Sequence, residues 1–165
     1  MVRHSIDAIP FHHDLFPKWR SYKAGGIRYF DSTNQIELCG VLDDIWVNKD
    51  EELIIVDYKA TARKGSVLLD LSNAWNSNNK RQVSFYAYIL KTLGFKIHKN
   101  AYCLYVIADN SKPALNENLA FETKVLPYCI DYSWIEKTIV NIRNCLDQEL
   151  IPDSNINCDL CKFNF

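Results

Sequence analysis

The hydrophobic and polar positions of the chain alternate with two different periods, one typical of strands and the other of helices. Short apolar or alternating runs predict strands over residues 27–30, 36–47, 53–60, 101–108 and 119–128. We expect Gly40 to kink or bulge the second of these strands. The last is expected to be an edge strand that Pro127 closes. Residues 61–77 are polar and are expected to be irregular.

Apolar residues at helical spacing predict two helices. The first covers residues 80–94, with Phe85 and Ile89 on its apolar face and Gly94 as its C-cap. The second is expected to open at a capping box of Ser133 and Glu136, followed by an apolar stripe of Ile135, Ile139, Ile142 and Leu146. This order of strands and helices predicts a single α/β domain over residues 1–165 with a mixed sheet.

The composition narrows the functional class. The chain has 165 residues, and 48% of them are hydrophobic, which suits one domain with a buried core. The sequence has no apolar run long enough to span a membrane and no signal-peptide pattern at its start, so we expect a cytoplasmic protein without membrane partners. Its six cysteines show no framework spacing and are expected to be reduced.

With a net charge of −1, the whole chain lacks the excess of positive charge typical of nucleic-acid-binding proteins. The charges are, however, unevenly distributed along the sequence. Two stretches contain no acidic residue: residues 15–30 and residues 71–108, which hold Lys80 and Arg81 among other cations. One interpretation is ordinary clustering on solvated faces. The other is a pair of basic surfaces that flank an acidic pocket, as the cleavage of a phosphodiester requires.

The most informative segment is GVLDDIWVNKDEELIIVDYKAT, residues 40–61. A hairpin turn centred on Asp50 places Val47 opposite Leu53, and Asp43 opposite Asp57. Directly opposed Cβ atoms lie about 4.5–5.5 Å apart, and like charges there repel. Two carboxylates beside an apolar face therefore need a partner. A divalent cation supplies it, since Mg²⁺ is often held by one or two carboxylates and by phosphate oxygens of the substrate.

Lys59 follows Asp57 by two residues and lies on the same face of the strand. An ammonium group there would orient or deprotonate an attacking water, or stabilise charge in the transition state. From spacing alone an equally good interpretation is a strand-end ion pair of Asp57 and Lys59, with Asp43 as a solvated edge residue.

Gly40 and Asp43, then Asp57 and Lys59 after an apolar strand, then Gln82 and Tyr86 on a helix resemble the RecB-type nucleases of the PD-(D/E)XK superfamily. These include the CRISPR-associated adaptation nucleases. The resemblance runs from about residue 12 to the end of the chain. It implies a restriction-endonuclease-like core, a mixed sheet flanked by helices, and a metal-dependent nuclease.

The resemblance also implies a role for each matching position. Asp43 and Asp57, with the backbone carbonyl of Tyr58, would bind catalytic Mg²⁺ or Mn²⁺, and Lys59 would be the catalytic lysine. Gln82 and Tyr86 would lie on the helix face that looks onto the active site, where they would act with the other catalytic residues by orienting the lysine or contacting substrate. Without the other motifs, this pair is better interpreted as a core tyrosine with a glutamine at a helix edge.

RecB-type members also use a histidine ahead of the first aspartate. The segment IPFHHDLFPKW resembles a P-F-x-H-[DE] stretch of bacterial members, which implies that His13 joins the metal shell. The adjacent His12 is the alternative. A lone histidine is more often structural than a ligand, so both interpretations stay open.

Cys158 and Cys161 form a C-x-x-C motif in the tail, residues 152–165. Many RecB-type nucleases bind an iron–sulfur cluster here, together with at least one cysteine near the start of the chain. No cysteine precedes Cys39 in this sequence. Either the missing ligands belong to an N-terminal region that this chain lacks through truncation, or the site has decayed to a plain pair. A bound cluster or zinc ion is therefore not the favoured expectation.

The leading hypothesis is a Mg²⁺- or Mn²⁺-dependent deoxyribonuclease that acts from DNA ends or on single strands. Its substrate backbone would be held by Arg63, Lys64, Lys80 and Arg81, and a base would stack on Tyr58, Trp75 or Tyr86. The alternative is a non-catalytic nucleic-acid-binding or scaffolding member of the same fold. The presence of Asp43, Asp57 and Lys59 argues against it, because a degenerate relative usually loses one of them. A metal phosphohydrolase built on His12, His13 and Asp14 needs more histidines than His4 and His98 supply.

Overall fold

A computed structural model of the chain describes residues 6–63, 74–109, 121–155 and 157–159. Its main sheet is mixed: the order is β1-β4-β5-β6-β7, and only β5 and β6 pair in parallel. The bounds are β1 (Ala8–Pro10), β4 (Asp44–Asn48), β5 (Leu53–Arg63), β6 (Asn100–Asp109) and β7 (Phe121–Cys129). The predicted α/β fold with a mixed sheet flanked by helices is confirmed.

The remaining named elements of the described residues are a small hairpin and three helices. The hairpin joins β2 (Ile27–Asp31) and β3 (Ile36–Gly40) in a separate two-stranded sheet. The helices are α1 (Phe16–Trp19), α2 (Ala74–Thr92) and α3 (Ile135–Leu146). None of the helices in the described part of the chain is long and apolar enough to cross a membrane.

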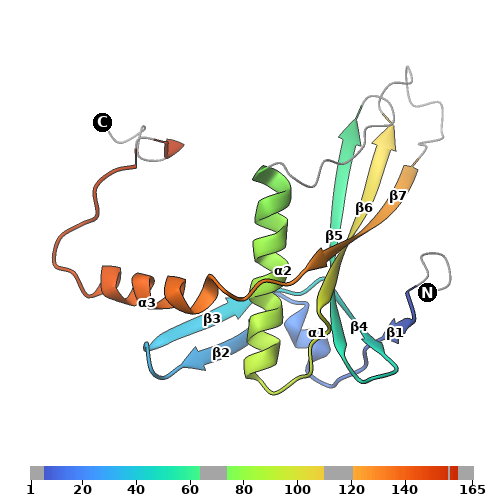
Figure 1. Cartoon of the computed structure of the whole chain (residues 1–165), viewed down its shortest axis with the longest axis horizontal. Coiled ribbons are helices and arrows are strands. Elements are labelled where there is room, and N and C mark those ends of the chain that lie inside the picture. The colour runs from blue at the N-terminus through green and yellow to red at the C-terminus, as the bar shows by residue number, and fades with distance from the viewer. Residues whose placement is uncertain (1–5, 64–73, 110–120, 156, 160–165) are drawn as a thin grey trace.

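The helix α2 lies between β5 and β6 in the chain and packs against one face of the main sheet (Figure 1). A parallel pair of strands needs such a crossover, because the chain must return to the same end of the sheet. The core forms between α2 and the sheet and includes Ile45, Ile55, Val83 and Leu90, each at most 1% exposed. This face of the sheet is the one on which the site is built.

A second, smaller cluster lies on the opposite face of the main sheet. It consists of Ala8, Trp46, Ile54 and Val56, with Ile6 and Tyr102 packed against it. Side chains alternate between the two faces along a strand, so neighbouring residues such as Ile55 and Val56 belong to different clusters. No helix residue belongs to this smaller cluster among the residues that the structure describes.

The prediction of one long strand over residues 36–47 is wrong. The chain forms two strands there, β3 and β4, which belong to different sheets. Leu42, between them, is 1% exposed and its N–H donates to the carbonyl of Trp19. Gly40, at the end of β3, allows a close approach to α2: a Cβ there would lie 2.4 Å from Cε1 of Tyr86. The predicted kink is thus a complete break, made by burial of Leu42 and contact with α2.

Other boundaries also differ from the prediction. Residues 61–77 are not all irregular, because parallel pairing with β6 carries β5 on to Arg63 and α2 already begins at Ala74. Pro127 does not close β7, which continues to Cys129; an edge strand tolerates a proline. Gly94 does end α2 as predicted, with φ +95° and N–H groups at residues 94 and 95 bonded back to the helix.

The prediction that a capping box of Ser133 and Glu136 opens α3 is also wrong. The N-cap of the helix is Trp134, without a side-chain cap bond. The N–H of Ser133 instead donates to Oδ1 of Asp131, so the serine belongs to the preceding turn. The short elements β1 and α1 were not predicted, since three or four residues are too few to show a period.

Candidate active site

The β4–β5 hairpin has the predicted register. Ile45 pairs with Ile55 and Val47 with Leu53. The ladder ends at the pair Asp44–Val56, one step before Asp43. Instead of facing Asp57 within the ladder, Asp43 accepts a hydrogen bond at Oδ2 from the backbone N–H of Tyr58, at 2.8 Å. The first carboxylate is therefore tied to the backbone directly after the second one.

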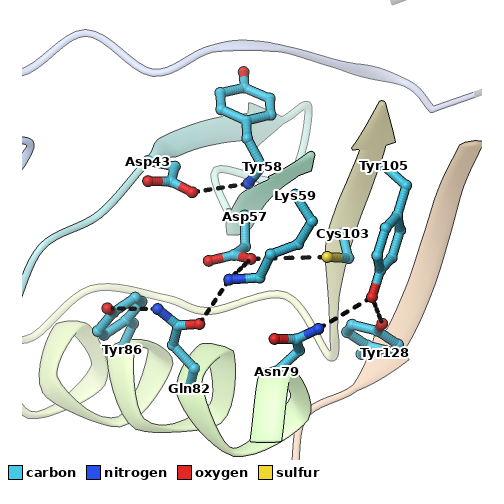
Figure 2. Close-up of polar contacts among 10 residues, drawn as sticks. All are labelled: Asp43, Asp57, Tyr58, Lys59, Asn79, Gln82, Tyr86, Cys103, Tyr105 and Tyr128. Carbon is cyan, nitrogen blue, oxygen red and sulfur yellow. Dashed lines mark hydrogen bonds and ion pairs between the residues drawn. The ribbon is translucent and has the colours of Figure 1, made fainter. Parts of the chain in front are cut away.

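Asp57, Lys59, Gln82 and Tyr86 form one continuous chain of polar contacts (Figure 2). Nζ of Lys59 lies 2.8 Å from Oδ2 of Asp57 and donates to Oε1 of Gln82 at 3.0 Å. Nε2 of Gln82 in turn donates to the hydroxyl of Tyr86 at 3.0 Å. The structure thus brings together four of the predicted residues, two from β5 and two from α2, on the face that α2 covers.

The Asp57–Lys59 pair is held away from water, with side chains 3% and 21% exposed. Burial raises the pKa of Asp57; the bonds from Lys59 oppose this rise, and the nearby charge of Asp43 adds to it. Burial by itself would lower the pKa of Lys59, but the hydrogen bond and charge of Asp57 outweigh it and raise the value. Burial thus makes the charged form of Asp57 costly, and Lys59 offsets only part of that cost.

In each of the two carboxylates, one oxygen atom has polar contacts and the other does not among the described residues. Oδ2 of Asp43 accepts from Tyr58, and Oδ2 of Asp57 contacts both Lys59 and the thiol of Cys103, whose Sγ is 3.7 Å away. Oδ1 of each accepts no hydrogen bond from the part of the chain that the structure describes. Two carboxylate oxygens suit a hard cation such as Mg²⁺, which takes its other ligands from water or substrate. The residues present therefore fit a divalent metal.

His13 lies in an aromatic cluster that includes Phe95, a residue just after the end of α2. Its ring stacks on Trp19 and Phe11, with centroids 5.0 and 5.7 Å apart, and its Nδ1 accepts from the N–H of Leu15. His12 is exposed. Within the described ranges, no three His, Cys, Asp or Glu side chains come close enough to hold a metal ion. The structure does not join either histidine to Asp43 and Asp57, so the histidine ligand stays a prediction.

The structure describes only some of the residues predicted to bind substrate or an iron–sulfur cluster. Lys80 lies over the ring of Tyr128, with Nζ 5.9 Å from the centroid, and Arg81 is exposed on α2. The ring of Tyr58 points away from Lys59 (Figure 2) and its hydroxyl donates to Oδ2 of Asp44. Outside the described residues lie Lys64, Cys161 and the side chains of Arg63 and Trp75. Cys158 is half-buried.

A group of polar side chains beside the site is absent from the residues that the sequence predicted. Parallel pairing of β5 and β6 sets Cys103 next to Asp57 and Tyr105 next to Lys59. The hydroxyl of Tyr105 accepts from Nδ2 of Asn79 at 3.1 Å and contacts the hydroxyl of Tyr128 at 3.2 Å (Figure 2). No sequence signal marks these residues, because their position depends on which strands are neighbours.

The comparison with protein families agrees with this geometry. The family model of the PD-(D/E)XK nuclease superfamily matches residues 5–165, which is nearly the whole chain. No curated protein and no solved structure matches the chain. Members of this superfamily are nucleases and generally use divalent metal ions such as Mg²⁺. With the family match and the Asp57–Lys59 arrangement on β5 together, the chain belongs to the PD-(D/E)XK nuclease superfamily.

Proposed function

We propose that this protein is a RecB-type, Mg²⁺- or Mn²⁺-dependent deoxyribonuclease of the cytoplasm that acts at DNA ends or on single strands. One observation carries the proposal: the ammonium of Lys59 is held between Asp57 and Gln82, and Asp43 is tied to the backbone beside them. A purely structural ion pair would not require the second carboxylate or the bond to α2.

Each residue of the site has a distinct task in this proposal. Asp43 and Asp57, with the carbonyl of Tyr58, would hold the cation, which when bound polarises a phosphoryl oxygen and lowers the pKa of a water. An ammonium has three N–H donors, and Asp57 and Gln82 accept two of those of Lys59. The third is left for a phosphate oxygen, where positive charge stabilises the transition state.

Gln82 and Tyr86 act as positioning residues. Gln82 fixes Nζ of Lys59, and the hydroxyl of Tyr86 fixes the amide of Gln82. Arg63, Lys64, Lys80 and Arg81 are proposed to hold the DNA backbone, and Trp75 or Tyr86 to stack a base. His13 is proposed as a further metal ligand, which requires a change in its present aromatic contacts.

The test compares two lysine variants on labelled DNA. In Lys59→Gln, the new amide can still donate to Asp57 and Gln82 but carries no charge. We expect wild type to degrade linear or single-stranded DNA when Mg²⁺ or Mn²⁺ is added. We expect Lys59→Gln to be about 10²- to 10³-fold slower. The matched control is Lys96→Gln, because Lys96 is an exposed lysine paired with Glu52, and it should keep full activity.

The substrate set separates the remaining alternatives. A closed circular single strand, a linear single strand and a blunt duplex distinguish an endonuclease from an end-dependent enzyme. If wild type binds nucleic acid but cleaves no DNA or RNA with any divalent cation, the proposal fails. The chain is then a non-catalytic binding member of the fold.

A further inference from the structure

One face of the sheet extension formed by β5, β6 and β7 has no helix packed on it within the described part of the chain. This outer face consists of the even-numbered residues 58–62 and 104–108 and the odd-numbered residues 121–125, which the strand registers place side by side. None of these residues is charged and none is buried. On β6 the alternation is clear: Cys103, Tyr105 and Ile107 on the α2 side are buried, whereas Leu104 and Val106 on the outer side are not.

The exposed apolar side chains of the outer face point to a protein partner. Tyr58 is 42% and Phe121 is 59% exposed. Because none of the residues that define the outer face is a cation, phosphate groups of DNA have nothing to bind there. A contiguous apolar surface rimmed by polar residues is typical of a protein–protein contact.

A second exposed apolar surface lies on α3. Ile135 and Ile139 are buried in the core, but Ile142 and Leu146 on the same helical stripe are 46% and 64% exposed. The apolar stripe therefore continues for two turns beyond the part of the helix that the core covers.

These two surfaces cannot meet within one chain. Ile135 and Ile139 belong to the core cluster that forms on the α2 side of the sheet. The outer face is on the other side of the same sheet, and Figure 1 shows α3 on the side of α2 and leading away from β7. A contact between the stripe and the outer face must therefore join two molecules.

The dimensions and the area favour a reciprocal contact. Five residues of β6 span about 13 Å and three strands about 10 Å, which matches one helix of about 10 Å diameter. One such contact is small beside the roughly 1,200–2,000 Å² that stable interfaces bury. A twofold axis repeats it, because each copy offers one stripe and one outer face. We propose that two copies form a symmetric dimer in which the exposed half of α3 of each copy covers the outer face of the other.

The experiment measures the mass of the full chain in solution by light scattering after size exclusion, at about 100 µM protein. We expect wild type to have twice the chain mass of 19.2 kDa. Val106→Lys, on the outer face, and Ile142→Glu, on the stripe, should each be monomers with unchanged circular dichroism. The matched control, Asn141→Glu, adds the same charge to α3 away from the stripe and should remain dimeric.

Mixing the two disruptive variants tests the exchange itself. In a dimer of one Val106→Lys chain and one Ile142→Glu chain, the unaltered stripe of the first chain meets the unaltered outer face of the second. The other contact brings the glutamate introduced on the stripe of one copy against the lysine introduced on the outer face of its partner, so dimers should return. A monomeric wild type, a dimeric Ile142→Glu variant, or a mixture that stays monomeric would each overturn the proposal. These outcomes are independent of nuclease activity, because neither Val106 nor Ile142 belongs to the site.

Discussion

At the scale of single residues, Tyr58 connects two carboxylates on different sides of the sheet. Its backbone N–H donates to Asp43, and its hydroxyl donates to Oδ2 of Asp44 at 2.5 Å. Asp44 is itself held by Nε1 of Trp46, a residue only 1% exposed. The backbone that fixes the first carboxylate of the site is therefore anchored from the opposite face.

The first prediction tests this anchor. Tyr58→Phe removes the hydroxyl and keeps the backbone N–H, so Asp43 keeps its partner but that partner becomes less well fixed. We expect nuclease activity to fall about fivefold to tenfold, equivalent to roughly 1 kcal/mol. The loss should be larger at low than at saturating Mg²⁺, which a metal titration of the cleavage rate measures. Equal losses at all Mg²⁺ concentrations would contradict the positioning role.

The second prediction concerns Cys103, which is buried beside Asp57. Burial and the negative charge of Asp57 raise the pKa of this thiol to about 12. At pH 8 only about one thiol in ten thousand is then ionised, and only the thiolate reacts. We expect iodoacetamide to label the exposed Cys39, Cys129 and Cys145 in the native protein, and Cys103 only after unfolding. Peptide mass mapping measures this, and rapid native labelling of Cys103 would contradict the burial.

At the scale of elements, the packing of β3 on α2 explains why a glycine ends the strand. A Cβ at Gly40 would meet Cε1 and Cδ1 of Tyr86 at 2.4 and 2.9 Å. Tyr86 is also the partner of Gln82. The β2–β3 hairpin and the site thus share one aromatic ring, and a change at the hairpin reaches Lys59 through α2.

The third prediction uses this shared ring. Gly40→Ala should destabilise the protein by about 1–3 kcal/mol, the usual cost of overpacking, and should lower activity. The double variant with Tyr86→Leu removes the ring that the methyl group meets, so its loss of stability should be smaller than the sum of the two single losses. Urea unfolding of the four proteins measures the coupling. Strict additivity would show that the two positions do not touch.

Elements set by local sequence were predicted better than those set by contacts with distant parts of the chain. The run Leu53–Lys59 and the spacing of Gln82 and Tyr86 are local features, so the strand and the helix face were correct. The break after Gly40 was missed because it results from contacts with Trp19 and α2 that lie far away in sequence. Local patterns report burial of a side chain, but they do not report which element buries it.

At the scale of the whole molecule, two nearby carboxylates should make the stability of the protein depend on metal. A ligand that binds only the folded state stabilises it by about 2.7 kcal/mol at 100 times its Kd. For a chain of this size that amounts to roughly 5–10 °C in Tm. The fourth prediction is that Mg²⁺ raises the Tm of wild type and that EDTA reverses the rise, measured by differential scanning fluorimetry.

Asp43→Asn is the matched variant for this measurement. Its side-chain oxygen can still accept from the N–H of Tyr58, but the charge that raises the pKa of Asp57 is gone. Without metal, we expect its Tm to equal or exceed that of wild type, because a repulsion is removed. With Mg²⁺ its Tm should not change. A drop without metal, or a full rise with Mg²⁺, would show that the two carboxylates do not share a cation.

The amino-acid sequence alone determined the hairpin register, the common face of Asp57 and Lys59, and the common face of Gln82 and Tyr86. These follow from the periods of strands and helices, which act over a few residues. Only the tertiary structure decided that Lys59 meets Gln82, that Cys103 lies beside Asp57 and that His13 stacks on Trp19. Such contacts depend on the order of strands and the packing of α2, which are set by the whole core and not by any local pattern.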